Sequence, residues 1–130
     1  MKWRSMTKLL KKSAEDNLSA HLSHNEFRCK CSRTECHFTL VDEHLINCFE
    51  KLRARWEKPI LVNSGFRCQA HNKATNGSVP NSRHTTGEAI DLRKPSDPEQ
   101  AKLFQQLCKD IFPHIIPYKG FVHCDLGDNN

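Results

Sequence analysis

The sequence predicts an α+β domain with a small, mainly antiparallel sheet flanked by helices. Two observations lead to this class. Apolar patterns typical of helices and of strands follow one another along the 130 residues, without the regular alternation of a doubly wound sheet. A chain of this length also has enough apolar surface for one core and too little for two. We therefore expect one domain over residues 21–130, preceded by a helical extension over residues 1–20.

The first elements are expected to be two helices of unequal strength. Residues 5–19 carry a thin apolar stripe and predict a helix that packs at the edge of the domain. A broader stripe recurs at helical spacing and predicts the main core helix. It consists of Val41, Leu45, Phe49, Leu52 and Trp56, and Pro59 ends it. Between the two helices, His21 and His24 lie in polar sequence and are expected to face solvent.

The elements after Pro59 are shorter, and each begins or ends at proline, glycine or a capping residue. In chain order they are a strand over residues 58–64, a helix over 69–75, a turn-rich loop over 76–81, a strand over 88–93, a helix over 96–111 and a strand over 120–126. The sequence Ser96-Asp97-Pro98-Glu99 is read as a capping box that opens the last helix. This irregular order of strands and helices is the pattern of the α+β class.

The composition narrows the partners. The formal charge of +5, from 20 Lys and Arg against 15 Asp and Glu, favours anionic partners such as nucleic acid, anionic lipid or a cell-wall polymer. The basic residues lack the interleaved aromatics that stack on bases, so we expect no nucleic-acid partner. No apolar run approaches the ~20 residues that span a bilayer, so we expect no integral membrane segment. The N-terminus lacks the apolar core of a signal peptide, so we expect synthesis in the cytoplasm.

The cysteines are seven, an odd number, and without an expected signal peptide they predict mostly reduced thiols. Cys29, Cys31, Cys36 and His37 together offer four ligands for a structural zinc ion. Their spacing lacks the familiar knuckle, however, and the fourth ligand adjoins the third. We therefore favour plain buried or loop thiols over a metal site for this cluster.

One stretch combines a histidine and an aspartate seven positions apart, with a glycine between them: Ser82-Arg83-His84-Thr85-Thr86-Gly87-Glu88-Ala89-Ile90-Asp91. Its second half reads as a strand, so a loop and an adjoining strand would bring His84 and Asp91 together. His123, in the last predicted strand, is the best third candidate. Two histidines and one carboxylate are a ligand set of catalytic zinc, which keeps a fourth position open for water. Zinc lowers the pKa of that water toward ~7 and polarises a carbonyl, so the set suits amide hydrolysis.

Two further residues are candidates for catalysis. Asp125 follows His123 by two residues, and on a strand such side chains share a face, so Asp125 is favoured over Glu88 as the general base. Arg67 follows a Ser64-Gly65-Phe66 turn and is a candidate for binding a substrate carboxylate or a developing oxyanion. Each of these residues taken singly is more often structural, so the prediction depends on the combination.

Three segments resemble the signatures of the zinc D-Ala-D-Ala carboxypeptidase family. They are Ser64-Gly65-Phe66-Arg67, Asn81-Ser82-Arg83-His84-Thr85-Thr86-Gly87-Glu88-Ala89-Ile90-Asp91 and Phe121-Val122-His123-Cys124-Asp125. The segment Leu22-Ser23-His24-Asn25-Glu26-Phe27-Arg28-Cys29 is similar to the start of small phage-encoded members, so the resemblance covers residues 22–127. It implies the fold that this family shares with the hedgehog signalling domain. It also implies activity on peptidoglycan stem peptides, as in bacteriophage endolysins.

The resemblance assigns roles to individual residues. It implies one catalytic zinc ion bound by His84, Asp91 and His123. It also implies that Ser82 contacts substrate and that Arg67 steadies the carbonyl oxygen of the scissile bond. One position departs from the pattern, because many members place the catalytic carboxylate three residues before the last histidine, where this chain has Gly120. Asp125, as in the branch with a V-H-x-D motif, is the favoured base.

These inferences predict a monomeric zinc metallopeptidase, a peptidoglycan hydrolase of L-Ala-D-Glu endopeptidase or D,D-carboxypeptidase type. A phage-type endolysin that reaches the bacterial cell wall after holin release, or from a virion, would suit the charge and the expected site of synthesis. The alternative is a catalytically inactive zinc-binding module of the same fold, by analogy with the hedgehog domain. A non-haem iron oxygenase is disfavoured, because its H-x-D precedes the lone histidine and lies on a jelly-roll of many strands.

Overall fold

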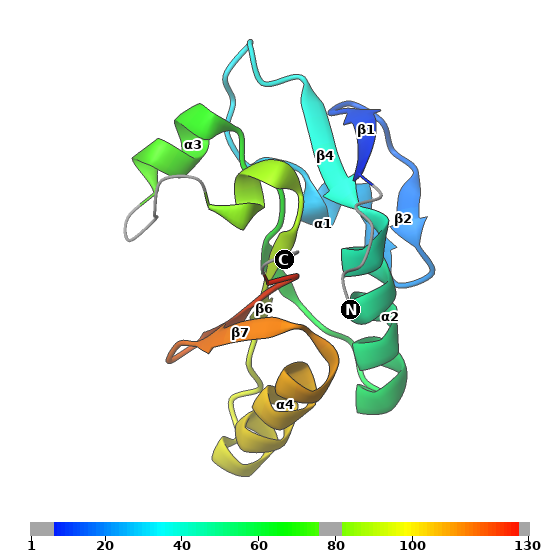
Figure 1. The fold of residues 1–130 in the computed structure, drawn as a ribbon, viewed down its shortest axis with the longest axis vertical. Helices are drawn as coiled ribbons and strands as arrows, with labels where there is room; N and C mark the ends of the chain where they lie inside the picture. The colour runs from blue at the N-terminus through cyan, green and yellow to red at the C-terminus, as the bar shows by residue number, and fades with distance from the viewer. Residues whose placement is uncertain (1–6, 76–81, 128–130) are drawn as a thin grey trace.

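The computed structural model describes residues 7–75 and 82–127, and it shows the predicted α+β class with small antiparallel sheets (Figure 1). The central sheet has four strands, in the order β5 (Val62–Ser64), β6 (Ala89–Arg93), β8 (Phe121–Asp125) and β7 (His114–Pro117). Two smaller sheets pair β1 (Thr7–Lys11) with β4 (Phe38–Asp42) and β2 (Asn17–Ser19) with β3 (Leu22–Ser23). The loop predicted over residues 76–81 lies outside the described residues.

The helices of the described residues are two long and two short ones. They are α1 (His24–Phe27), α2 (Glu43–Trp56), α3 (Gln69–Ala74) and α4 (Pro98–Ile111), with a 3-10 turn η1 (Arg83–Thr86) before β6. The predicted core helix, the short helix after the Ser64-Gly65 turn and the last helix are therefore confirmed, with shifted ends. None of the helices in the described part is long and apolar enough to cross a membrane.

The central sheet has one apolar and one polar face. Ile90, Leu92, Val122 and Cys124 are fully buried in the hydrophobic core. Because successive strand residues point to opposite faces, the residues between them, which include Asp91 and His123, lie on the other side. The strands predicted over residues 88–93 and 120–126 are confirmed to within one residue at each end as β6 and β8. Their alternating pattern is what separates the core from the polar face.

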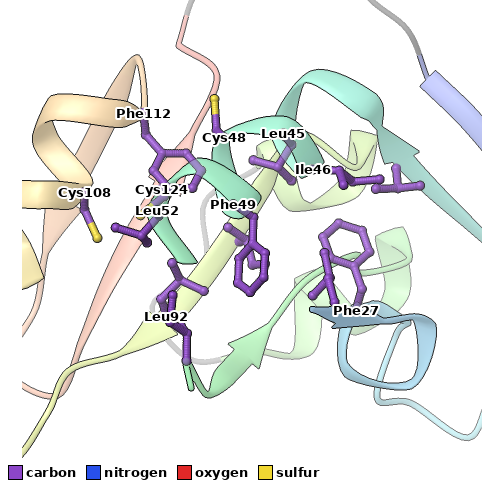
Figure 2. Close-up of a cluster of buried hydrophobic side chains, with 14 of the residues drawn as sticks. Phe27, Leu45, Ile46, Cys48, Phe49, Leu52, Leu92, Cys108, Phe112 and Cys124 are labelled. Carbon is purple, nitrogen blue, oxygen red and sulfur yellow. The ribbon is translucent and has the colours of Figure 1, made fainter. Parts of the chain in front are cut away.

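The core joins α2 and α4 to the apolar face of the sheet. Figure 2 draws this cluster, with Phe49 and Leu52 of α2, Leu92 of β6 and Phe112 just after α4. The rings of Trp56 and Phe104 meet edge to face with centroids 5.1 Å apart, which ties α2 to α4. Full burial of one Leu or Phe side chain stabilises a fold by about 1.5–3 kcal/mol. The two helices thus hold the sheet from its apolar side and leave the polar face to other segments.

The helix predicted over residues 5–19 is wrong throughout its described part. Residues 7–11 form β1, which pairs with β4 from Thr7 opposite Asp42 to Lys11 opposite Phe38, and residues 17–19 form β2. The apolar stripe of the predicted helix is not buried together, since Leu9 is 69% exposed. Pairing with a strand distant in the sequence has overridden a weak local preference. The extension over residues 1–20 is therefore not helical where it is described.

His24 is buried, contrary to the prediction that it faces solvent. Its Nδ1 donates to the Ala14 carbonyl at 2.6 Å, and its Nε2 lies 2.7 Å from the Thr39 hydroxyl. The ring therefore links the β1–β2 connection to β4 as a structural histidine. His21 is exposed as expected, and its Nδ1 lies 2.8 Å from Glu50.

Several predicted boundaries move. The main helix begins at Glu43 because the Asp42 side chain accepts a hydrogen bond from the His44 backbone and caps it, so Val41 belongs to the unpredicted strand β4. Helix α4 is capped by Asp97 rather than by Ser96, with Asp97 accepting from the Gln100 amide at 2.9 Å. The strand predicted over residues 58–64 is shortened to β5, and β7 was not predicted.

Candidate metal centre

The register of the central sheet gathers polar side chains in one row. Asp91 of β6 lies directly opposite His123 of β8, and Ser64 of β5 lies opposite Asp91. Facing residues of an antiparallel pair point to the same side of the sheet. Asp125 shares this face because it follows His123 by two residues. The sheet therefore presents two of the three predicted ligands side by side, from strands far apart in the sequence.

His84 reaches this row from η1 and is held on both sides. The Ser82 Oγ caps η1 and accepts a hydrogen bond from the His84 amide at 3.2 Å. The Gly65 carbonyl accepts from His84 Nδ1 at 2.7 Å, and the Arg67 amide donates to the His84 carbonyl at 3.0 Å. The ring is 2% exposed, so its position is set by these contacts rather than by solvent.

One nitrogen of each of His84 and His123 and one oxygen of Asp91 lie close together. A carbonyl only accepts, so His84 carries its proton on Nδ1 and presents a bare Nε2, which lies 3.1 Å from Asp91 Oδ1. His123 donates from Nε2 to Asp125 Oδ2 at 2.8 Å, and its Nδ1 lies 3.0 Å from the same Asp91 oxygen, so Nδ1 offers a lone pair once the ring is neutral. Three acceptors this close require a cation among them, which is either a proton or a metal ion. The three ligand atoms lie within 4.8 Å of one another, and their types fit zinc.

Arg67 fixes the second oxygen of Asp91. Its Nη2 donates to Asp91 Oδ2 at 3.2 Å, its Nη1 donates to Asn72 Oδ1 at 3.2 Å, and its Nε donates to Ser64 Oγ at 3.2 Å. The side chain is only 12% exposed. The carboxylate of Asp91 is therefore held with Oδ1 toward the two imidazoles and Oδ2 toward the guanidinium.

The geometry agrees with a comparison against protein families. The family model described as Peptidase M15 matches residues 20–125, most of the chain. The chain belongs to the peptidase M15 family. This confirms the resemblance found in the three motifs and supports a metallopeptidase that acts on peptidoglycan-type substrates. The family depends on zinc, and the donor set of His84, Asp91 and His123 fits that ion. A comparison with curated proteins gave no match.

In this M15 chain, Asp125 lies beyond the His123 ring as seen from Asp91. Its Oδ2 accepts from His123 Nε2 at 2.8 Å and from His114 Nδ1 at 2.9 Å, and its Oδ1 accepts from the Gly127 amide at 2.7 Å. These contacts are typical of a carboxylate that orients a metal-binding imidazole. The predicted role of Asp125 as general base stays a prediction, because that role needs the carboxylate to contact the attacking water.

The electrostatics of the site follow from these contacts. Burial alone would raise the pKa of Asp91, but hydrogen bonds with His123 and His84 lower it to about 2. Burial would likewise raise the pKa of Asp125, but His123, His114 and the Gly127 amide lower it to about 2. Burial would lower the pKa of His123, but its bonds to Asp125 and Asp91 raise it to about 9. With both carboxylates ionised, the row attracts a cation to the position between Asp91 and the two rings.

The other predicted residues lie at the edge of this arrangement. Ser82 serves as the cap of η1, and its predicted contact with substrate stays a prediction. Glu88 contacts the Thr86 hydroxyl at 2.5 Å and the Arg83 guanidinium at 3.8 Å, so it is turned toward η1. Gly120 is exposed, and a Cβ there would meet no atom of the described residues within 4 Å. No carboxylate can act from that position.

Three contributors to the site were missed at the level of sequence. Gly65 acts through its carbonyl, which leaves no side-chain signal. Asn72 of α3 bonds Arg67, and a hydrogen-bonding partner at i+5 has no recognisable pattern. His114 contacts Asp125 from β7, where its Cα lies opposite that of Asp125. Recognition of β7 as a strand would have placed His114 on the polar face.

A second group of possible metal ligands lies apart from this one. It consists of Cys29, Cys31, Cys36 and Cys68, with all seven cysteines of the chain present as free thiols. His37, which the sequence suggested as a fourth ligand, is exposed, and its Nδ1 lies 3.4 Å from the Thr34 carbonyl. Cys68, the N-cap of α3, completes the group instead.

Proposed function

We propose that this protein is a zinc-dependent peptidase that hydrolyses peptidoglycan stem peptides, of the L-Ala-D-Glu endopeptidase or D,D-carboxypeptidase type. The observation that supports this most strongly is that three possible metal-ligand atoms, from His84, Asp91 and His123, lie close together on one sheet face of an M15 chain. The formal charge of +5 supports approach to an anionic cell-wall polymer. We place its action at the bacterial cell wall, as a monomeric phage-type endolysin.

In this proposal, His84 Nε2, Asp91 Oδ1 and His123 Nδ1 hold one zinc ion. When bound, zinc lowers the pKa of a water toward ~7 and polarises the carbonyl of the scissile bond. The chain's own groups hold the ligands ready for it. The Gly65 carbonyl fixes the tautomer of His84, and the Asp125 carboxylate fixes the tautomer of His123.

Arg67 has two tasks in the proposed site. Three of the five N–H groups of its guanidinium hold Asp91, Asn72 and Ser64. The remaining N–H groups are the proposed donors to the carbonyl oxygen of the scissile bond, where negative charge develops during attack. Because the guanidinium is fixed before substrate arrives, it needs little reorganisation when that charge appears. Ser82, the N-cap of η1, is the proposed further contact to substrate.

Asp125 acts on His123 in this proposal. Its Oδ2 stays bonded to the imidazole and keeps Nδ1 turned toward Asp91. A further role as general base would require the carboxylate to exchange this bond for one with the attacking water. The two roles differ in what Asp125→Asn would change, since a positioning residue affects metal affinity and a base affects turnover alone.

The test is digestion of purified sacculi by the zinc-loaded protein, with mass spectrometry of the released peptides. We expect peptide products from the wild type and from the His37→Ala variant, which alters an exposed histidine outside the row. We expect no products and loss of the zinc of this site in His84→Ala. Full cleavage by His84→Ala would contradict the proposal, and the masses of the products would identify the bond.

A catalytically inactive zinc-binding module is the second candidate. It is favoured by one observation, that Asp125 is engaged by two histidines while Gly120 stands at the other position of the catalytic carboxylate. A zinc-loaded wild type that binds sacculi, keeps its metal and releases no peptide would support this module over the enzyme.

A further inference from the structure

Four thiols from two distant segments meet in the described part of the chain. The Sγ atoms of Cys29, Cys31, Cys36 and Cys68 all lie within 4.8 Å of one another. Cys29 and Cys36 are buried, and the other two are half-buried. Three of the four come from the loop between α1 and β4, and Cys68 begins α3, which this loop passes in Figure 1. Such a gathering of thiols is independent of the histidine site.

The spacing of the sulfur atoms suits a tetrahedral ion. Zinc binds thiolate sulfur at about 2.3 Å, so two sulfurs of a tetrahedral site lie about 3.8 Å apart. The Cys29 and Cys68 sulfurs are 3.7 Å apart, and so are those of Cys31 and Cys68. A disulfide would require about 2.05 Å. Cys68 is thus separated from two partners by the distance expected across a zinc ion.

The surroundings provide donors to the sulfur atoms. The ammonium of Lys12 lies 3.4 Å from Cys36 Sγ and 3.7 Å from Cys31 Sγ, and it donates to the Cys31 carbonyl at 2.8 Å. The Cys68 amide donates to Cys29 Sγ at 3.4 Å, and the His71 amide donates to Cys68 Sγ at 3.4 Å. Four thiolates around a divalent ion leave two negative charges, which an ammonium and oriented N–H groups offset.

We propose that Cys29, Cys31, Cys36 and Cys68 bind a structural zinc ion, distinct from the ion at His84, Asp91 and His123. Thiolates and a closed set of four protein ligands are the chemistry of structural rather than catalytic zinc. The ion would fasten the α1–β4 loop to the start of α3. Because Cys68 follows Arg67 directly, it would also fix the segment that presents Arg67 and Gly65 to the candidate catalytic site.

Metal content separates the two sites. Protein purified under reducing conditions with added zinc, then freed of loose metal by gel filtration, is analysed by elemental mass spectrometry. We expect two zinc ions per wild-type chain and one in the His84→Ala/His123→Ala double variant. Cobalt(II) bound to that double variant should show sulfur-to-metal charge-transfer absorption, because only thiolates remain as its ligands. A folded double variant that retains no zinc, or a cobalt complex without this absorption, would overturn the proposal.

Cysteine variants complete the test. Cys68→Ser should weaken metal binding and lower the intensity of the sulfur-to-cobalt absorption, because three thiolates remain, while Cys48→Ala, which changes a buried cysteine of α2 outside the group, should leave both unchanged. If Cys68→Ser fails to fold, the double histidine variant decides the outcome alone. The intact mass of wild-type protein gives a second readout. A mass that is lower by the hydrogens of a disulfide, with Cys68 cross-linked in the peptide map, would contradict metal binding by these thiols.

Discussion

The substitution Gly87→Ala tests how the fold delivers His84 to the sheet. Gly87 ends η1 with a φ of +77°, in the left-handed region that side chains disfavour. A Cβ at this position would lie 2.2 Å from the Leu40 carbonyl oxygen, and the contacting atoms belong to the backbone of β4. The Gly87 carbonyl also accepts from the Asp42 amide at 3.0 Å, so the two segments are fastened at this point.

Two effects contribute to the loss of stability expected for Gly87→Ala. A non-glycine residue in the left-handed region costs about 1–2 kcal/mol. Forcing a methyl group into a closely packed contact costs about 1–3 kcal/mol more, because backbone rather than a flexible side chain must move. We therefore expect Gly87→Ala to lower the free energy of unfolding by about 2–5 kcal/mol, a large share of the 5–15 kcal/mol typical of a domain. For a chain of this size, the melting temperature should fall by roughly 6–20 °C.

Urea denaturation of Gly87→Ala and Gly120→Ala provides the measurement with its matched control. Gly120 is exposed, and a Cβ there has open space, so its replacement should change stability by less than about 0.5 kcal/mol. Zinc titration of both variants should show weaker binding only in Gly87→Ala, since movement of η1 displaces the His84 ring. Equal midpoints for the two variants would refute the steric reasoning and the proposed delivery of His84 by this turn.

Three further changes test the site and the core. Asp125→Asn removes the charge that orients His123, so zinc affinity, measured with a competing chelator, should fall by ~10–100-fold. Unchanged zinc affinity with loss of the acidic limb of the pH–rate profile would instead identify Asp125 as the general base. Arg67→Lys keeps the charge but loses the planar guanidinium that holds Asp91, Asn72 and Ser64, so kcat/KM on a muropeptide should fall by about 10-fold or more. The control Lys73→Arg changes an exposed residue and should leave kcat/KM unchanged. Equal activity of the two variants would contradict the role of the guanidinium. Phe49→Ala removes a fully buried ring from the core and should lower the free energy of unfolding by about 3–5 kcal/mol. Leu103→Ala, at an exposed position of α4, should change the free energy of unfolding by less than about 0.5 kcal/mol. A small effect of Phe49→Ala would show that the cluster of Figure 2 is not the main core.

The strands that carry the ligands were predictable because their signal is local. Buried Ile90 and Leu92 alternate with Asp91, and Val122 and Cys124 alternate with His123. The sequence of each strand therefore shows which residues face the core and which face the opposite side. Antiparallel pairing then places Asp91 opposite His123, which no spacing along the chain encodes directly. The motif resemblance compensated for this, since it had already grouped the two residues.

The elements that escaped prediction are those whose stability comes from distant partners. β1 exists because β4 provides its hydrogen bonds, and its own residues show a weak helical stripe instead. Cys68 joins the thiol group from beyond three intervening elements, β4, α2 and β5, so the sequence suggested Cys29, Cys31, Cys36 and the adjacent His37 instead. The sequence pattern favoured His37, which is adjacent to Cys36 in the chain, whereas the fold places Cys68 next to the other three thiols.

One short segment, residues 64–68, shows why these local and distant contacts are coupled. The Ser64 hydroxyl accepts from the Arg67 Nε, and the Gly65 carbonyl fixes the His84 ring. The Phe66 amide donates to the Phe27 carbonyl at 2.7 Å. A Cβ on Gly65 would lie 2.4 Å from the Phe27 ring, so the segment passes too close to α1 for any side chain there.

The last two residues of that segment extend the coupling in opposite directions. Arg67 donates to Asp91 in the histidine site, while Cys68 belongs to the thiol group. An ion bound by the thiols would therefore fix Arg67 through a single peptide unit, without contacting substrate. We accordingly expect disruption of the thiol group to reduce activity through the position of Arg67, with the zinc of the histidine site retained. That combination would distinguish a structural ion from a second catalytic one.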